Sequence, residues 1–98
     1  MFARVTTLRG PGDQVDQGIT TVRDQVLPAA RQMDGFRGML ALADRSAGTM
    51  IGITLWESEA ALQASEEAAN QLRSDSAAAG GAEVVSVERY EVVIDEPT

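Results

Sequence analysis

The first segment with strand character contains two side chains that could bind a substrate. Arg4 and Thr6 alternate along it, so both would project from one face of a β-strand. A fixed cation there would hold an anionic substrate or stabilise a developing oxyanion, and the threonine would add a hydroxyl group. The structural alternative for Arg4 is a salt bridge to Glu88 or Glu91 on the last strand.

Trp56 and Tyr90 are two further candidates. Trp56 is the only tryptophan and ends a later strand-like segment. Its ring would either form one wall of a pocket for a flat substrate or pack the strand against the following helix. The Tyr90 phenol would either orient a substrate or pack its ring and leave its hydroxyl in water. We take Arg4, Thr6, Trp56 and Tyr90 as candidate ligand-pocket residues, and the sequence identifies no catalytic residue.

The absence of histidine and cysteine excludes several kinds of site. Without them the chain has no imidazole base, no thiol nucleophile, no disulfide and no zinc site of the common kinds. A further group of carboxylates has the distribution of a solvated helix surface rather than of a catalytic pair. They are Glu57, Glu59, Glu66 and Glu67. We therefore expect no metal and no cofactor.

The charge balance limits the partners of the chain. The 98 residues carry a net charge of −7, which disfavours nucleic acids and anionic membrane surfaces. No signal-peptide pattern and no apolar run long enough to span a bilayer is visible. We therefore expect a cytoplasmic protein.

The first half of the chain predicts a strand followed by a helix. Near-alternation of apolar and polar residues indicates a strand over residues 2–8. Apolar residues at steps of three and four then indicate an amphipathic helix that Asp13 caps and that ends at Gly35. Pro28 lies inside this helix and predicts a kink or a break near Val26.

The second half predicts a hairpin, a helix and a last strand. Residues 36–44 and 49–56 are typical of two strands, and the link between them is short enough for a hairpin. Both strands are apolar on both faces, so both faces of the sheet should be covered. Ser58 would cap a second helix with a small, alanine-rich inner side. Residues 73–81 then form a loosely specified connection to a strand at 83–94.

The element order is β-α-β-β-α-β. With right-handed crossovers it predicts a ferredoxin-like α+β fold, with a four-stranded antiparallel sheet in the order 4-1-3-2 and both helices on one face. Residues 1–98 would form a single domain. The other face would be bare and would hold several members of an apolar set: Val5, Met39, Ile53, Trp56, Val85 and Val87. Because a lone chain would expose this patch, we expect a homodimer, or a higher oligomer built from it.

Several stretches resemble the antibiotic biosynthesis monooxygenase-like family. They are residues 33–38 (MDGFRG), residues 55–62 (LWESEAAL) and the terminal residues 89–92 (RYEV). The resemblance spans nearly the whole chain and implies a dimeric α+β barrel, in which two such sheets pair. That fold hosts oxygenases, isomerases, haem-degrading enzymes and proteins without known activity, so it does not identify a reaction.

The resemblance implies a small cofactor-independent monooxygenase or isomerase acting on an apolar or aromatic metabolite, whose own carbanion would meet oxygen. Haem degradation is disfavoured because that branch of the family relies on a histidine iron ligand. The alternative function is a non-catalytic ligand-binding or structural dimer, since few polar residues are expected around Trp56. RNA-binding and acylphosphatase domains share the element order, but the charge and the lack of a phosphate-binding loop argue against both.

Overall fold

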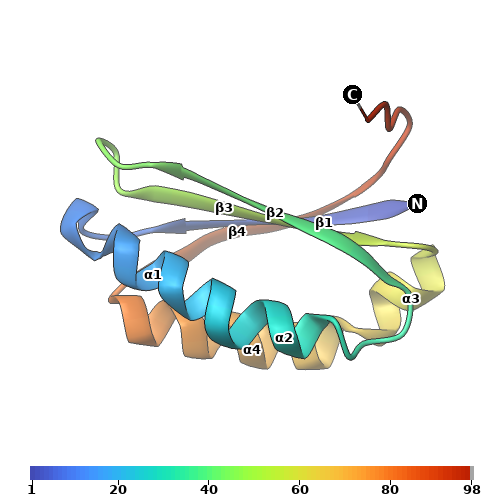
Figure 1. Ribbon diagram of the computed structural model, residues 1–98, viewed down its shortest axis with the longest axis horizontal. Coiled ribbons are helices and arrows are strands. Elements are labelled where there is room, and N and C mark those ends of the chain that lie inside the picture. Colours follow the sequence, from blue (N-terminus) through green and yellow to red (C-terminus); the bar gives the residue numbers. More distant parts are fainter. Residues whose placement is uncertain (98) are drawn as a thin grey trace.

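Strands and helices form two layers in the computed structural model (Figure 1), which describes residues 1–97 and, within residues 76–80, the backbone alone. The strands are β1 Phe2–Arg9, β2 Phe36–Asp44, β3 Thr49–Trp56 and β4 Glu83–Glu91. The helical elements between β1 and β2 are the 3-10 turn η1 Gly12–Gln14, α1 Val15–Thr21, the π-helical turn η2 Val22–Val26 and α2 Leu27–Ala30. Those between β3 and β4 are α3 Glu59–Ala64 and α4 Glu66–Gly80.

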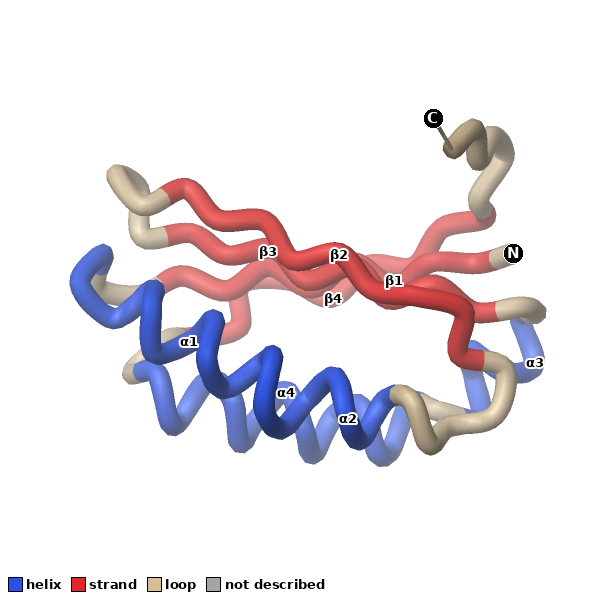
Figure 2. The backbone as a smooth tube through the Cα atoms, viewed as in Figure 1, coloured by secondary structure: helices blue, strands red, loops and turns tan. Residues whose placement is uncertain are grey.

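The strands form one antiparallel sheet in the order β2-β3-β1-β4, as the element order predicts. β2 and β3 make the expected hairpin, and β1 lies between β3 and β4. The helices cover one face of this sheet and leave the other open (Figure 1, Figure 2). The predicted ferredoxin-like α+β fold is therefore confirmed.

Cross-strand register decides which side chains face the helices. Arg4 on β1 lies opposite Thr54 on β3 and Arg89 on β4, and this row faces the helices. Side chains alternate along a strand, so the next row, with Val5 opposite Ile53, points to the open face.

The open face of the sheet is apolar. Six aliphatic side chains gather on it from β1, β2 and β3: Val5, Leu40, Leu42, Ile51, Ile53 and Leu55. Of the other residues predicted for this face, Met39, Trp56 and Val87 face the helices instead, and Val85 lies at a register shift of β4. We expected both faces of the sheet to be covered, but in the single chain the helices cover only one of them.

The helix after β1 is irregular. Asp13 lies in η1, and its side chain makes no capping hydrogen bond to the helix, so the predicted N-cap is wrong. The π-helical turn η2 comes just before Pro28, which has no N–H to donate and whose ring crowds the preceding turn. A π-turn accommodates such a mismatch without ending the helix. The kink or break predicted near Val26 is therefore a π-helical turn.

The turn into β2 depends on a glycine. The helix ends at Ala30, earlier than predicted, but Gly35 has the expected left-handed backbone, with φ of 81°. A Cβ on Gly35 would lie 2.5 Å from the Cβ of Ala61. The carbonyl of Gly35 accepts a hydrogen bond of 2.9 Å from Glu57 N–H. Gly35 therefore ties the start of β2 to the start of α3.

The second helical segment is longer than predicted. Ser58 caps α3 as expected, because its Oγ accepts a hydrogen bond of 3.1 Å from Ala61 N–H. After a one-residue interruption at Ser65, α4 continues to Gly80, so the loose connection predicted over residues 73–81 is wrong for nearly all of its length. The alanines of this stretch favour a helix more strongly than its serines and aspartate oppose one. None of the helices in residues 1–97 is both long and apolar enough to cross a membrane.

The last strand is shorter than predicted. β4 ends at Glu91, which lies opposite Phe2 at the start of β1, so beyond it no strand remains to pair with. The following segment leaves the sheet on the side away from the helices (Figure 1). Val93 and Ile94 in this segment are each 82% exposed.

Candidate functional site

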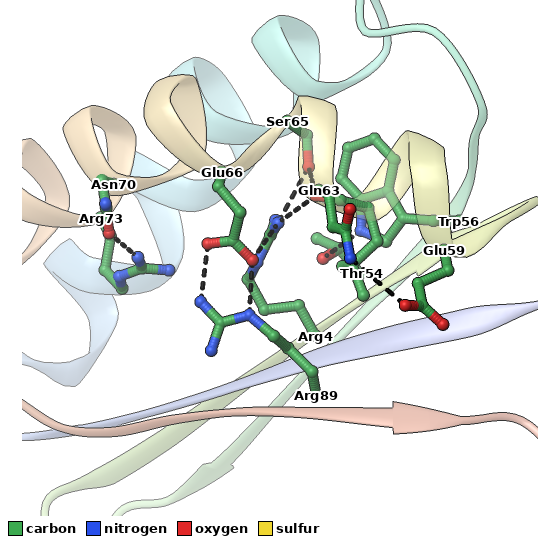
Figure 3. A network of polar contacts seen from close by, with 11 residues as sticks. Arg4, Thr54, Trp56, Glu59, Gln63, Ser65, Glu66, Asn70, Arg73 and Arg89 are labelled. Atoms are coloured by element: carbon green, nitrogen blue, oxygen red, sulfur yellow. Dashed lines mark hydrogen bonds and ion pairs between the residues drawn. The ribbon is translucent and has the colours of Figure 1, made fainter.

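Arg4 is buried between the sheet and the break in the second helical segment. Its side chain is 3% exposed, and its Nη2 donates hydrogen bonds of 2.9 Å to the Leu62 carbonyl and 2.9 Å to Ser65 Oγ. Ser65 separates α3 from α4, and its hydroxyl donates to the same carbonyl at 2.8 Å. The helix break thus supplies the acceptors that hold the guanidinium group in place (Figure 3).

The ion-pair partner of Arg4 is Glu66, whose Oε1 lies 3.1 Å from Nη2. The salt bridge predicted to Glu88 or Glu91 is wrong. Glu88 lies opposite Val5, so its side chain points to the open face of the sheet. Glu91 lies opposite Phe2 at the end of the strand pair, and neither acid contacts Arg4.

Glu66 is shared between two arginines. Arg89 binds both of its carboxylate oxygens, with 2.6 Å between Nη2 and Oε2 (Figure 3). The hydrogen bonds from Arg89, helped by those from Arg4 and opposed by burial, lower the pKa of Glu66 to about 2. Glu66 is therefore ionised at neutral pH and is a poor proton acceptor.

Trp56 fixes the other side of the Arg4 guanidinium. It is 1% exposed, its Nε1 donates a hydrogen bond of 3.0 Å to Thr54 Oγ1, and its ring meets that of Phe36 edge-on with 5.7 Å between centroids. The Arg4 Cζ lies 5.5 Å from the centroid of the Trp56 ring, at cation–π distance. The indole is thus a core aromatic and also a rigid wall beside a buried charge.

A cavity of about 90 Å³ opens beside Arg4, between the sheet and the helices. Arg4, Thr6 and Trp56 all line it, so the structure brings together three of the four predicted pocket residues. Most of the remaining lining is apolar and includes Val22, Val26, Met33, Met39, Met50 and Leu72. The cavity is therefore mainly apolar and has the positive charge of Arg4 in its wall.

Tyr90 does not belong to this cavity. It lies opposite Ala3, one residue out of phase with Arg4 and Arg89, and it is 52% exposed. Its hydroxyl donates a hydrogen bond of 2.7 Å to Glu88, which raises the pKa of the phenol. Tyr90 thus belongs to the open face of the sheet.

Arg73 is a cavity residue that the sequence did not predict. It lies on α4, lines the cavity and donates a hydrogen bond to Asn70 Oδ1, one turn earlier (Figure 3). Burial lowers the pKa of Arg73, and the positive charge of Arg4 lowers it further. The spacing of seven residues from Glu66, which places both on one helix face, could have identified it if the helix had been predicted to continue.

Among the residues that the structure describes, none in the cavity lining is an acid. Across the side chains that the structure describes, no group of three or more histidine, cysteine, aspartate or glutamate residues lies close enough to hold a metal ion. The lining can therefore bind, orient and stabilise negative charge, but it offers no carboxylate or imidazole to accept a proton.

Comparison with known sequences identifies a family and relatives. The family model for antibiotic biosynthesis monooxygenase matches residues 1–75. A protein of Mycobacterium tuberculosis H37Rv named only as uncharacterised is 37% identical over 92 residues, which are 94% of this chain and 41% of that protein. The chain thus spans about two fifths of the length of the curated relatives it matches.

Solved structures share the fold at low sequence identity. A Deinococcus radiodurans protein classed with the antibiotic biosynthesis monooxygenases has a TM-score of 0.75 at 18% identity, covering 100% of this chain and 98% of that one. A Streptomyces coelicolor monooxygenase in complex with nanaomycin D has a TM-score of 0.70 at 18% identity, covering 99% and 92%. A haem degrader of M. tuberculosis with two haems bound has a TM-score of 0.70 at 23% identity, covering 99% and 100%.

Proposed function

This chain belongs to the antibiotic biosynthesis monooxygenase family, and on that premise we propose that it binds a small apolar or aromatic metabolite in the cavity beside Arg4 and oxygenates it without a metal or cofactor. The observation that carries the proposal is a buried cation, Arg4, fixed against Trp56 in the wall of an otherwise largely apolar cavity. Such a wall accepts a flat ring and stabilises negative charge on it.

The proposed reaction requires only what the cavity lining offers. An acidic phenol or enol loses the proton of its oxygen, and the anion carries part of its negative charge on a carbon that bears a hydrogen. That carbon adds to O₂, and the peroxide anion takes up a proton to give a hydroperoxide. Loss of water from the hydroperoxide leaves a ketone, so one oxygen atom enters the product and the other leaves as water. The substrate is the reductant and O₂ the oxidant. Arg4 stabilises the anion, and the rigid walls orient it.

The proton must leave without help from a carboxylate in the cavity wall. Glu66 is the acid nearest to Arg4, and its pKa of about 2 makes it a weak base. The substrate must therefore be acidic enough to ionise when a cation is close. Activated phenols, enols and hydroquinones meet this condition, and simple hydrocarbons do not.

Haem does not fit this cavity. The chain has neither histidine nor cysteine, Tyr90 lies on the other face of the sheet, and the cavity methionines would lack the histidine with which methionine ligates haem in cytochromes c. No step of the proposed reaction involves haem.

The proposal is tested by oxygen uptake with a panel of phenolic and hydroquinone substrates, using labelled O₂ to follow the oxygen atom into the product. Trp56→Phe should raise KM by about threefold to tenfold, because the smaller ring loses stacking area and weakens the contact with the charge. The dimer should be unaffected, since Trp56 faces the helices. An unchanged KM would remove Trp56 from the site.

Tyr90→Phe is the matched control. It also alters an aromatic residue, but one that lies outside the cavity lining. We expect the same KM and the same turnover as for the unmodified protein. A loss of turnover in this variant would move the site to the open face.

A non-catalytic ligand-binding protein is the second candidate function. The lack of an acid among the described residues of the cavity lining favours it, because a binding protein needs no proton acceptor. In that case substrates that bind should cause no oxygen uptake. Product formation from any bound substrate would exclude it.

We further propose that a second copy of the chain covers the open face of the sheet, in a cytoplasmic protein of which residues 1–98 form one domain. The six aliphatic side chains of that face support the pairing, because a monomer rarely exposes so continuous an apolar surface. A two-fold axis would place the two sheets face to face.

A further inference from the structure

We propose that the ligand of this cavity is longer than one ring and carries an unbranched alkyl tail. The ring lies beside Arg4 and Trp56, and the tail runs along the sheet over a glycine, Gly52, to a second hollow behind Met50. The inference rests on the proposed function for the position of the ring. It adds the tail to the substrate class and assigns the selection for ligand shape to Gly52 and Met50.

The second hollow lies next to the cavity, against α1. It has a volume of about 30 Å³, and no charged side chain of the described residues lines it. Leu8, Val22 and Met50 line both spaces, so these side chains separate them. Val15 and Gly18 of α1 line only the second one. The two spaces are therefore neighbours, with a partition of apolar side chains between them.

Both spaces lie along one row of the sheet. Three residues of β1 face the helices in turn: Arg4, Thr6 and Leu8. Their partners on β3 are, in the same order, Thr54, Gly52 and Met50. An extended strand rises about 3.4 Å per residue, so the row from Arg4 to Leu8 is about 14 Å long. A ligand that fills this row from end to end is longer than a single aromatic ring.

Gly52 leaves the middle of the row without a side chain. A glycine weakens the interior of a strand, and it often marks a place where a ligand or another backbone comes close. Gly52 is not among the glycines with a positive φ, so its backbone does not require this residue type. Among the described residues, a Cβ built on it would meet only the Cε of Met39, at 3.8 Å, which is ordinary contact. The packing of the chain leaves room for an alanine, whereas a ligand in the row would need the glycine.

A second glycine makes room for Met50. Gly18 lies inside α1, where a glycine is less favourable than an alanine. A Cβ on Gly18 would lie 3.0 Å from Met50 Sδ, which is closer than ordinary contact. The methionine side chain is unbranched and adapts its shape easily. A change in the rotamer of Met50 would therefore join the two spaces.

The polarity of the row favours an apolar tail. Arg4 and Thr54 lie at one end, whereas Leu8 and Met50 at the other end offer only apolar surface. A polar tail would lose its hydration there, but each CH₂ group that leaves water adds about fourfold to the affinity. The second hollow has about a third of the volume of the cavity, so it suits the end of a narrow chain.

The experiment measures the affinity of four phenols by isothermal titration calorimetry. We expect 4-hexylphenol to bind at least about tenfold more tightly than 4-ethylphenol, which is less than the full gain per CH₂ because the Met50 thioether must move. 4-tert-Butylphenol has as many carbons as 4-butylphenol but a branched tail. It should bind about tenfold more weakly than 4-butylphenol, because the path over the sheet is narrow.

The variants assign the selection to the two residues. Gly52→Ala should reduce the gain from 4-ethylphenol to 4-hexylphenol to less than about threefold, without lowering the thermal unfolding temperature, since its Cβ finds ordinary contact in the empty chain. Met50→Ala should bind the branched and the straight butyl tail equally, because the partition is shortened. Val5→Ile is the matched control: it also adds one carbon, but on the open face of the sheet, and should keep the full gain.

The outcomes separate this inference from the proposed function. Equal affinities for 4-ethylphenol and 4-hexylphenol would overturn the tail and leave the cavity as a ligand site. So would equal affinities for the two butylphenols in the unmodified chain, or a gain with tail length that survives in Gly52→Ala. If none of the four phenols binds, the cavity is not the ligand site, and the proposed function fails together with the inference.

Discussion

Glu66 is the counter-ion on which the buried charge of Arg4 depends. It is 27% exposed, whereas Arg4 is 3% exposed, so the pair lies at the edge of the core rather than inside it. Breaking such a pair costs more than the pair itself contributes, because the buried partner keeps its charge without compensation. At the scale of single residues, Glu66 should therefore matter to stability while opposing the binding of anions.

Glu66→Gln separates these two effects. The variant should be less stable at pH 7 by about 2 kcal/mol, measured by urea denaturation, because Arg4 loses its ionic partner. Removing the negative charge should also increase the affinity for 4-nitrophenolate by about threefold or more. Glu67→Gln is the control, because Glu67 is exposed and carries the same charge on the next position of α4. A loss of both stability and phenolate affinity in Glu66→Gln would indicate a general loss of the site instead.

Stability should also depend on pH through Glu66. Its pKa of about 2 in the folded chain lies below its ordinary value of 4.5, so folding favours the ionised form. The contribution is therefore present above pH 4.5 and is lost as the pH falls toward 2. The difference in unfolding free energy between the unmodified chain and Glu66→Gln should shrink over this range. A difference that stays constant from pH 5 to pH 2.5, by denaturation at each pH, would contradict the assignment.

At the scale of elements, the site depends on two interruptions in helices and one glycine turn. The break at Ser65 turns the Leu62 carbonyl and the Ser65 hydroxyl toward Arg4. The π-turn before Pro28 places Val22 and Val26 on the cavity wall. Gly35 brings the start of β2, with Phe36, close to the end of β3, with Trp56.

Gly35→Ala tests the turn. An alanine there would adopt an unfavourable left-handed backbone and would place its Cβ 2.5 Å from that of Ala61, so we expect a loss of about 3 kcal/mol in thermal or urea unfolding. Gly81→Ala is the matched control, because Gly81 has φ of 65° but a Cβ added there would meet no atom within 4 Å. It should lose only about 1 kcal/mol, from backbone strain alone. Equal losses in the two variants would show that the contact with Ala61 does not matter.

At the scale of the whole molecule, the two faces of the sheet differ in what covers them. The helix-covered face holds the cavity, and the open face holds the aliphatic patch. Leu40 and Leu42 on that patch are 56% and 47% exposed in the single chain. Covering them with a second copy would leave the cavity where it is, so the proposed pairing and the proposed ligand binding would use opposite surfaces of one sheet.

Leu40→Glu tests the pairing. We expect the unmodified chain to sediment as a dimer at micromolar concentration, and the variant to raise the dissociation constant by at least about tenfold, because the interface would bury an unpaired charge. Ala60→Glu, which adds the same charge at an exposed position of α3, is the control. Circular dichroism should show that both variants stay folded. A monomeric unmodified chain would contradict the pairing.

The amino-acid sequence by itself determined the order of the elements, the strand order, the hairpin and the Ser58 cap, because these depend on local periodicity, turn residues and chain handedness. It also placed Arg4 and Thr6 on one face, since that needs only the alternation of a strand. Element ends were less predictable: α4 continues past Leu72, and β4 stops when β1 no longer pairs with it.

Only the tertiary structure decided which face of each strand meets the helices and which partner each charge takes. A shift of one residue moves a side chain to the other face, so Tyr90 was separated from Arg4, and Glu66 replaced Glu88 and Glu91 as its partner. Arg73 reached the cavity because α4 continues past Leu72, which its alanines favour although a loose connection was predicted there. The face that each strand turns to the helices and the partner of each charge depend on contacts between residues far apart in the chain, and no local pattern encodes them.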